Sequence, residues 1–298
     1  MSFLSFSIIG YLLLSVEAVL SKWVLTGRLK SWELYVFYVG IFSVFSFFLA
    51  PLGLEKVSGF VFWLSFISGI IFLLAMIFLF KALYVSTATR VYVLFGSITT
   101  ITTFGISEII MQIPITFWQV LGVILLLLGG FFISYKFHEK RFSRSWKKIV
   151  IAGILAGASL VMLKIAYENQ NFVSGYIYSR GGIVFATLLL LVWPNFRRAV
   201  LKGLSGGKKK NAGDFFAVVG TKSLAGLGTV AVQYGVFLGS VTIVSALVSV
   251  QYLLTFIFSA FLSIRYRKIF QEELSSSNLF FKFVGVGLVI AGVIFVNF

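Results

Sequence analysis

Two apolar segments, WQVLGVILLLLGG at 118–130 and FVGVGLVIAG at 283–292, each carry two glycines seven residues apart. The pairs are Gly122 with Gly129 and Gly285 with Gly292. Seven residues are about two turns of an α-helix, so each pair lies on one helix face. Glycines on one face let another backbone approach closely, as membrane helices do when they pack. The two segments therefore predict membrane helices that occupy equivalent places in a duplicated chain.

The similarity between the two halves continues toward the N-terminus. A further long apolar stretch precedes each of the two segments. Aligning Lys22 with Lys164 also places Gly40 opposite Gly182 without a gap. We therefore expect the helices that come before the glycine pairs to be duplicated as well.

The composition indicates a membrane protein. The chain of 298 residues is 59% hydrophobic and only 11% charged, whereas soluble domains carry about 25% charged residues. It has no cysteine, which excludes disulfides and thiolate metal sites. We expect an all-α integral membrane protein of the cell (cytoplasmic) membrane, because the apolar stretches do not show the polar alternation of barrel strands.

Ten apolar stretches are each close to the roughly 20 residues that cross a bilayer as a helix. The first five form a predicted repeat at 1–135, a basic linker follows at 136–148, and the last five form a second repeat at 149–298. The ten predicted transmembrane helices cover 3–24, 33–52, 60–81, 88–109, 116–135, 149–167, 173–193, 214–237, 241–264 and 279–297.

The basic residues between these helices predict the orientation. Nearly all Lys and Arg outside the helices fall in the odd-numbered connections, and the even connections and tails hold only Lys56. Basic loops stay cytoplasmic, so both termini should lie outside. Five helices per half is an odd number, which makes the halves inverted repeats. The connection at 194–213 is expected to be mobile, and anionic lipid headgroups are the expected partners of the basic loops.

Several motifs resemble those of a known family. They are ALYVSTA at 82–88, Glu108 before WQVLG at 118–122, GG at 129–130, and Glu272-Glu273 before FVGVG at 283–287. In this arrangement the chain resembles the EamA-type members of the drug/metabolite transporter superfamily over nearly its whole length. The resemblance implies ten helices in two halves and a role in metabolite efflux.

Ionisable groups inside a membrane helix are costly unless they face protein or water, so they are candidates for function. Three of the basic ones lie near predicted helix ends, where they can extend to the headgroups. These are Lys81, Arg90 and Lys282, and the others are Lys22, Lys164, Arg180 and Lys222.

Glu17 lies well inside the first predicted helix, with Ser21 on the same face. It is the candidate proton-coupling carboxylate. The alternative is a structural ion pair with a basic residue of another helix, either Arg180 or Lys222.

Lys22 and Lys164 occupy matched positions in the two halves. In an inverted repeat, Lys22 would serve the inner mouth of a substrate path and Lys164 the outer one. The alternative for Lys164 is a solvated pair with Glu168, one turn further along the helix.

Arg180 and Lys222 each lie about two turns inside a predicted helix. The guanidinium of Arg180 suits a carboxylate or a phosphate, and the resembled family often has an arginine at this place. Either residue could instead pair with Glu17 for folding. The polar residues at similar depth could bind substrate or join helices; these are Gln233, Tyr234, Gln251 and Tyr252.

The charges predicted at depth are mostly positive. They favour a secondary transporter that moves a small anionic or zwitterionic metabolite, such as an amino acid or organic acid, by alternating access between inverted repeats. Proton-coupled export is the expected direction. The alternative is a multidrug or quaternary-cation exporter in which Glu17 and aromatic rings hold the cation.

Other classes of function find little support. The only histidine is His138, in the basic linker, and no phosphate-binding glycine loop occurs. An intramembrane lipid-modifying enzyme and a scaffold are the remaining alternatives. We expect no enzyme activity, no cofactor, no metal and no nucleic-acid partner. The chain should be a monomer or a homodimer, because the glycine faces could pack within one molecule or against a second copy.

Overall fold

The structure is a computed structural model that describes residues 3–111, 116–136, 141–142, 145–205, 212–266 and 276–296. Almost all of them are helical, and a two-residue antiparallel ladder pairs Tyr135–Lys136 with Arg141–Phe142. The helices are α1 (Phe3–Trp23), the π-helix η1 (Val24–Leu29), α2 (Trp32–Ser43), the 3₁₀-helix η2 (Val44–Leu52), α3 (Gly59–Val85), α4 (Ala88–Met111), α5 (Phe117–Ser134), α6 (Trp146–Tyr167), α7 (Phe172–Val192), α8 (Pro194–Ser205), α9 (Ala212–Leu238), α10 (Val241–Ala246), α11 (Val248–Arg265) and α13 (Ser276–Val296).

The prediction of an all-α membrane protein is confirmed. Within the described residues, seven helical stretches are long and apolar enough to cross a membrane. Shorter apolar stretches lie at 117–126 in α5 and at 283–292 in α13. Ten crossings arranged as inverted repeats remain a prediction. The seven stretches are Phe3–Leu29, Trp32–Leu52, Gly59–Val85, Trp146–Tyr167, Phe172–Val192, Phe215–Leu238 and Val241–Ile264.

Short polar side chains begin several of these helices. Each cap accepts a hydrogen bond from a backbone N–H of the first turn, which would otherwise lack a partner. Asn171 accepts from the backbone N–H of Ser174 at 2.8 Å, and Ser31 accepts from that of Leu34 at 3.2 Å. Lys30, just before Ser31, has a left-handed backbone with φ of 53° and ends η1.

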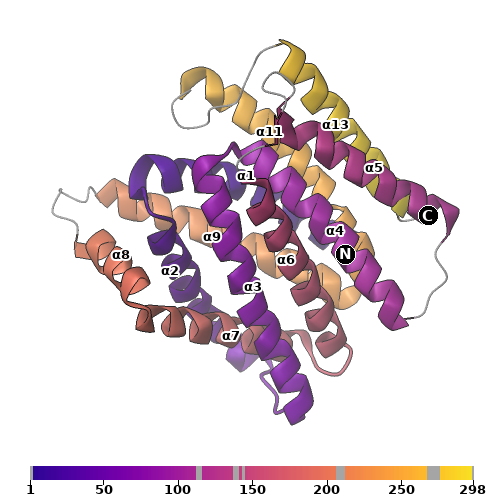
Figure 1. Ribbon diagram of the computed structural model, residues 1–298. Coiled ribbons are helices and arrows are strands. Elements are labelled where there is room, and N and C mark those ends of the chain that lie inside the picture. Colours follow the sequence, from indigo (N-terminus) through magenta and orange to yellow (C-terminus); the bar gives the residue numbers. More distant parts are fainter. Residues whose placement is uncertain are drawn as a thin grey trace.

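The glycine pairs of the two halves pack against each other. A Cβ added at Gly129 would lie 2.7 Å from the carbonyl oxygen of Gly285, and one at Gly292 would lie 2.7 Å from that of Gly122. Only glycine permits this approach, and the pairs meet in antiparallel register. The predicted close contact is confirmed, and it occurs within the chain, between α5 and α13 (Figure 1).

The remaining helices interleave the two halves. The first predicted transmembrane helix of each half packs along the third one of the other half, α1 on α9 and α6 on α3. A Cβ on Gly10 of α1 would lie 2.8 Å from the carbonyl oxygen of Gly228 on α9. On the other side, the Ser159 hydroxyl of α6 donates to the Ser68 carbonyl of α3 at 2.8 Å. Each half therefore depends on the other for its packing.

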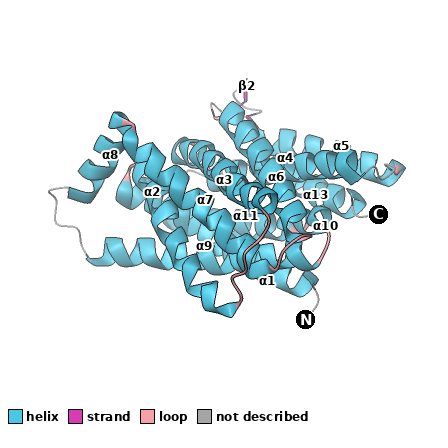
Figure 2. Cartoon of the chain, turned by 90° about the horizontal axis from the view of Figure 1, so that it is seen from below, coloured by secondary structure: helices cyan, strands magenta, loops and turns pink. Residues whose placement is uncertain are grey.

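Contacts between connections define two ends of the bundle. At the first, the linker end, the hydroxyls of Ser86 and Ser145 are 2.8 Å apart. At the opposite end, the side-chain amide of Asn171 donates to the Gly53 carbonyl at 2.8 Å. In both views α5 and α13 lie at one edge, and α8 lies at the opposite edge (Figures 1 and 2).

The prediction of a mobile, unfolded segment at 194–213 is wrong for 194–205, which forms α8. Proline at the first helical position is favourable because its missing N–H would have no partner there. Phe196 and Val200, one turn apart, are buried, and Phe196 packs near the Trp32 ring of α2 with centroids 6.3 Å apart. Burial of this apolar face stabilises a helix at 194–205, although Gly203 and the glycines and lysines of the sequence at 206–210 favoured a loop. Residues 206–211 lie outside the described residues.

A Gly129→Ala substitution tests the α5–α13 contact. The new methyl group overlaps the α13 backbone, and overpacking of this kind costs about 1–3 kcal/mol. We expect the melting temperature of the purified protein to fall. Gly287→Ala on α13 is the control, because nothing lies within 4 Å of its Cβ position, and it should leave the melting temperature unchanged or raise it. Equal shifts for the two variants would contradict the account.

Candidate functional site

A cavity of about 690 Å³ lies between the two halves of the chain. Its volume is within the roughly 300–1,000 Å³ of small-molecule sites. Residues of α1, α2, η2, α3 and α4 line it from the first half, and residues of α6, α7, α9, α10 and α11 from the second. No described residue of α5 or α13 takes part. The wall is mainly apolar and aromatic, with a few charged and polar groups.

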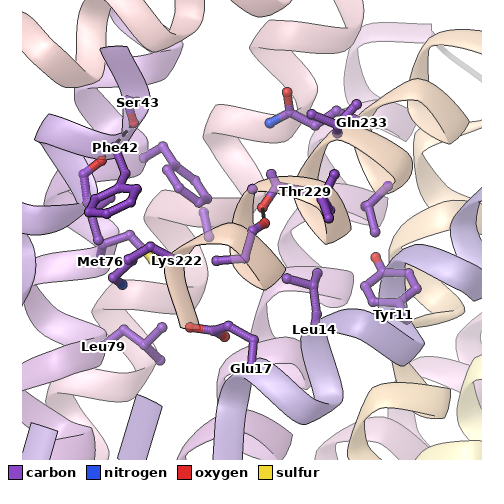
Figure 3. Close-up of a pocket in the computed structure, with 18 of the residues that line it drawn as sticks. Tyr11, Leu14, Glu17, Phe42, Ser43, Met76, Leu79, Lys222, Thr229 and Gln233 are labelled. Atoms are coloured by element: carbon purple, nitrogen blue, oxygen red, sulfur yellow. Dashed lines mark hydrogen bonds between the residues drawn. The ribbon is translucent and has the colours of Figure 1, made fainter. Parts of the chain in front are cut away.

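Figure 3 shows how the helices bring these groups together. Tyr11 and Glu17 come from α1, and Lys222, Thr229 and Gln233 come from α9. These two helices pack closely along Gly10 and Gly228, which places both sets of side chains on one wall. The contact between the halves therefore also forms the candidate site.

Arg180, on α7, has the most unusual environment on this wall. Its side chain is 6% exposed, and its Nε and Nη2 atoms have no hydrogen-bond partner among the described residues. The guanidinium carbon lies 4.6 Å from the centroid of the Tyr176 ring, one turn earlier on the same helix. Stacking on a ring stabilises the cation but leaves the N–H donors unused. A buried donor without an acceptor is unfavourable, so Arg180 is set up to bind an anion.

Lys222, on α9, is 5% exposed and lies against two aromatic rings. Its Nζ is 3.6 Å from the centroid of Tyr35 and 5.1 Å from that of Phe80. The edge-to-face packing of these rings, with centroids 4.7 Å apart, holds them in place. Such contacts stabilise a desolvated ammonium by about 2 kcal/mol.

Glu17 is the carboxylate of the cavity wall and begins a chain of hydroxyl groups. The Ser21 hydroxyl donates to Glu17 Oε1 and is also bonded to the Tyr35 hydroxyl. The prediction that Ser21 shares the face of Glu17 is confirmed. Glu17 and Lys222 attract each other electrostatically, but the Lys222 ammonium lies over the Tyr35 ring and makes no ion pair with Glu17. The described residues show no direct ion-pair contact of Glu17 with Lys222 or Arg180, and of the two only Lys222 interacts with Glu17 electrostatically.

Three of the predicted polar residues line the cavity. The Gln233 amide oxygen accepts from the Tyr167 hydroxyl at 3.3 Å, and the Gln251 amide donates to the Leu14 carbonyl at 3.3 Å. Both glutamines therefore also join helices, as the alternative reading proposed. The buried Tyr252 hydroxyl occupies the space beside Gly96, where any Cβ would overlap it, and it has no hydrogen-bond partner among the described residues.

Three other predicted binding residues lie away from this wall. Lys22 is 1% exposed and donates to the Leu83 carbonyl at 2.7 Å. Tyr234 packs edge-to-face on Phe6, with centroids 4.9 Å apart. Lys164 is half-buried in the last turn of α6 and does not line the cavity. The two matched lysines are therefore not part of the site as described.

The sequence analysis missed the tyrosines of the site other than Tyr252. Tyr176 precedes Arg180 by four residues, the spacing that places two side chains on one helix face, and this signal could have identified it. Tyr35, on α2, approaches Lys222 only through the tertiary fold. Tyr11 and Tyr92 also line the cavity. The side chain of Glu108 and the pair at 272–273 lie outside the described residues.

The described part of the chain contains no group of three or more His, Cys, Asp or Glu side chains that could hold a metal ion. No protein-family model and no curated protein matches the chain.

Solved structures do match it, 24 chains in all. One of them, described as "Crystal structure of protein", is 14% identical, with a TM-score of 0.64. The match covers 99% of this chain and 98% of that one. At this identity the likeness shows a shared fold and says nothing of function.

A Ser21→Ala substitution tests the hydroxyl chain at Glu17. It removes a hydrogen bond to a buried carboxylate, which is worth about 1.5–3 kcal/mol. We expect a lower melting temperature than in the wild type. Ser15→Ala is the matched control. Ser15 is equally buried on the same helix, but its hydroxyl donates to the backbone carbonyl of Leu12 and not to a carboxylate. Equal melting temperatures for the two variants would mean that the hydrogen bond to Glu17 stabilises the protein no more than the one to the backbone.

Proposed function

We propose that this chain is a secondary transporter with ten spans in two inverted repeats, and that it moves a small anionic or zwitterionic metabolite through the central cavity. The observation that supports this most is the buried guanidinium of Arg180 on the cavity wall, with two nitrogens that lack acceptors in the part of the chain that the structure describes. A ligand carboxylate would supply acceptors in a geometry that suits the planar fork.

The charges of the wall support the same substrate class. Arg180 and Lys222 are positive, and Glu17 is the one negative side chain among the residues that line the cavity. An excess of positive charge favours a ligand with a carboxylate or phosphate. A zwitterion such as an amino acid would also place its ammonium near Glu17, since opposite charges attract strongly where water is excluded.

The arrangement of the halves supports alternating access. Each half contributes its first four predicted transmembrane helices to the cavity, while α5 and α13 pack on each other outside it. A site between two interleaved halves can open to either side if they rock against each other. The basic residues predict that the linker end faces the cytoplasm and that both termini lie outside. Proton-coupled export through Glu17 is the proposed direction.

A second candidate function is export of aromatic or quaternary cations. The observation that favours it is the ring pair Tyr35 and Phe80, which already holds the Lys222 ammonium in the wall. Rings in the same wall could hold a cationic ligand in the same way, with Glu17 as its counter-ion.

An Arg180→Met substitution tests the principal proposal. It removes the donor fork and leaves an apolar side chain of comparable length. We expect ligand binding, screened by thermal stabilisation against amino acids and organic acids in detergent, to weaken roughly tenfold or more. The melting temperature without ligand should stay unchanged or rise, because an unsatisfied buried charge has been removed. Lys56→Ala, in an exposed connection, is the control.

The two measurements together separate function from folding. A structural role for Arg180 would lower the melting temperature without ligand. Unchanged binding of every amino acid and organic acid that stabilises the wild type would remove the main support for the proposal.

A Glu17→Gln substitution separates the two substrate classes. The second candidate predicts that the wild type binds ethidium and that the variant, which lacks the carboxylate charge, binds it at least about tenfold more weakly. The principal proposal predicts no measurable ethidium binding by either protein. Fluorescence titration of the purified proteins checks this.

A further inference from the structure

Helix α8 lies at the linker end but outside the bundle of long helices. At Trp193, the last residue before it, ψ is 117°, so the chain leaves the helical conformation of α7 and starts a new helix at Pro194. Phe196, Val200 and Gly203 face the bundle, and a Cβ on Gly203 would lie 2.7 Å from a methyl carbon of Leu34 on α2. One face of α8 is therefore fixed to the protein.

The rest of the α8 surface divides into two flanks. A residue turns about 100° around the axis of a helix, so Leu201 and Leu204 fall on one side of the buried face. Their side chains are 54% and 40% exposed. Arg198 and Lys202, both exposed, fall on the other side. One sector of the α8 surface would thus contact the protein, a second the hydrocarbon, and a third the charged headgroups.

Arg197 is the exception, since it projects within the apolar flank and is exposed. A long arginine side chain can keep its stem along apolar surface and extend its guanidinium to the headgroups. Its position is therefore compatible with a helix that lies at a membrane surface.

The surroundings of α8 have the composition of a membrane interface. At the linker end, three cations lie over tryptophan rings, the residue type enriched at headgroup level. Lys81 is 4.2 Å from the Trp32 ring centroid, against which α8 also packs. The two other pairs lie nearby in the fold, at the end of α1 and the start of α6; they are Arg28 with Trp23 at 4.7 Å and Lys147 with Trp146 at 5.8 Å.

We propose that α8 lies in the plane of the membrane interface and that its basic flank, Arg198 with Lys202, binds the headgroup of an anionic phospholipid. The leucine flank inserts among the acyl chains of the same leaflet. An amphipathic helix with both features gains from apolar burial and from attraction to anionic lipid. The site is separate from the cavity, so this inference does not rest on the proposed transport function.

The test is a lipid titration of the purified protein in detergent, read as the melting temperature. Phosphatidylglycerol should raise it, and phosphatidylcholine should raise it less. In Arg198→Gln/Lys202→Gln, the phosphatidylglycerol concentration that gives half of the maximal rise in melting temperature should increase roughly 25-fold, because two cations that attract the anionic headgroup are lost. The matched control Lys147→Gln/Lys148→Gln removes two exposed cations of the basic linker from the same end, and its titration should shift several-fold less than that of Arg198→Gln/Lys202→Gln.

Two outcomes would overturn the proposal. One is an unchanged titration in Arg198→Gln/Lys202→Gln, and the other is an equal loss in both double variants, which would mean a diffuse surface charge without a site on α8.

A second measurement tests the placement of the helix. The chain has no cysteine, so Leu204→Cys and Arg198→Cys each offer one spin-label position in liposomes. We expect the Leu204→Cys label to be relaxed mainly by oxygen, which concentrates in lipid, and the Arg198→Cys label mainly by a water-soluble nickel complex. If the nickel complex reached both labels equally, α8 would be a water-exposed surface, open to an acidic protein partner, and the lipid proposal would fail.

Discussion

A guanidinium that is buried in an apolar bundle needs acceptors for its N–H groups, and no described residue supplies one to Nε or Nη2 of Arg180. Within a membrane-embedded fold, each donor without an acceptor costs free energy. The chain keeps the charge beside a cavity, with Tyr176 stacked against it, and leaves two nitrogens without partners among the described residues. The proposed function follows from this one group, because an anionic ligand is the acceptor that the fold does not supply.

The glycine contacts explain how such a cavity persists in a tightly packed bundle. Gly129 with Gly285 and Gly122 with Gly292 bring α5 and α13 together at one edge. The contact of α1 with α9, through Gly10 and Gly228, closes the wall that carries Glu17 and Lys222. Close packing of the helix backbones at these glycines contributes dispersion energy, and this contribution does not require side chains to fill the central cavity. The space between the halves can therefore stay open for a ligand.

Much of the fold could be predicted because hydropathy and glycine spacing are local signals. Helix α8 was missed because Gly203 and the glycines and lysines of the sequence at 206–210 suggested a loop, although Phe196 and Val200 carry a helical spacing that could have revealed it. The site was predicted in part. Burial of Arg180 and Lys222 follows from their depth in apolar stretches, but their neighbours do not. The Leu83 carbonyl that accepts from Lys22 lies 61 residues away, and only the tertiary fold brings them together.

Alternating access to the central cavity is the claim on which the transport account depends, and thiol labelling tests it directly. Thr229 lines the cavity from α9, and Thr229→Cys provides a single thiol in a chain that otherwise has none. In liposomes, a membrane-impermeant thiol reagent is supplied either outside or inside, with and without a ligand identified by thermal stabilisation. The account predicts labelling from both sides and protection by the ligand. A thiol that reacted from neither side, or from one side only whether or not ligand was present, would contradict it.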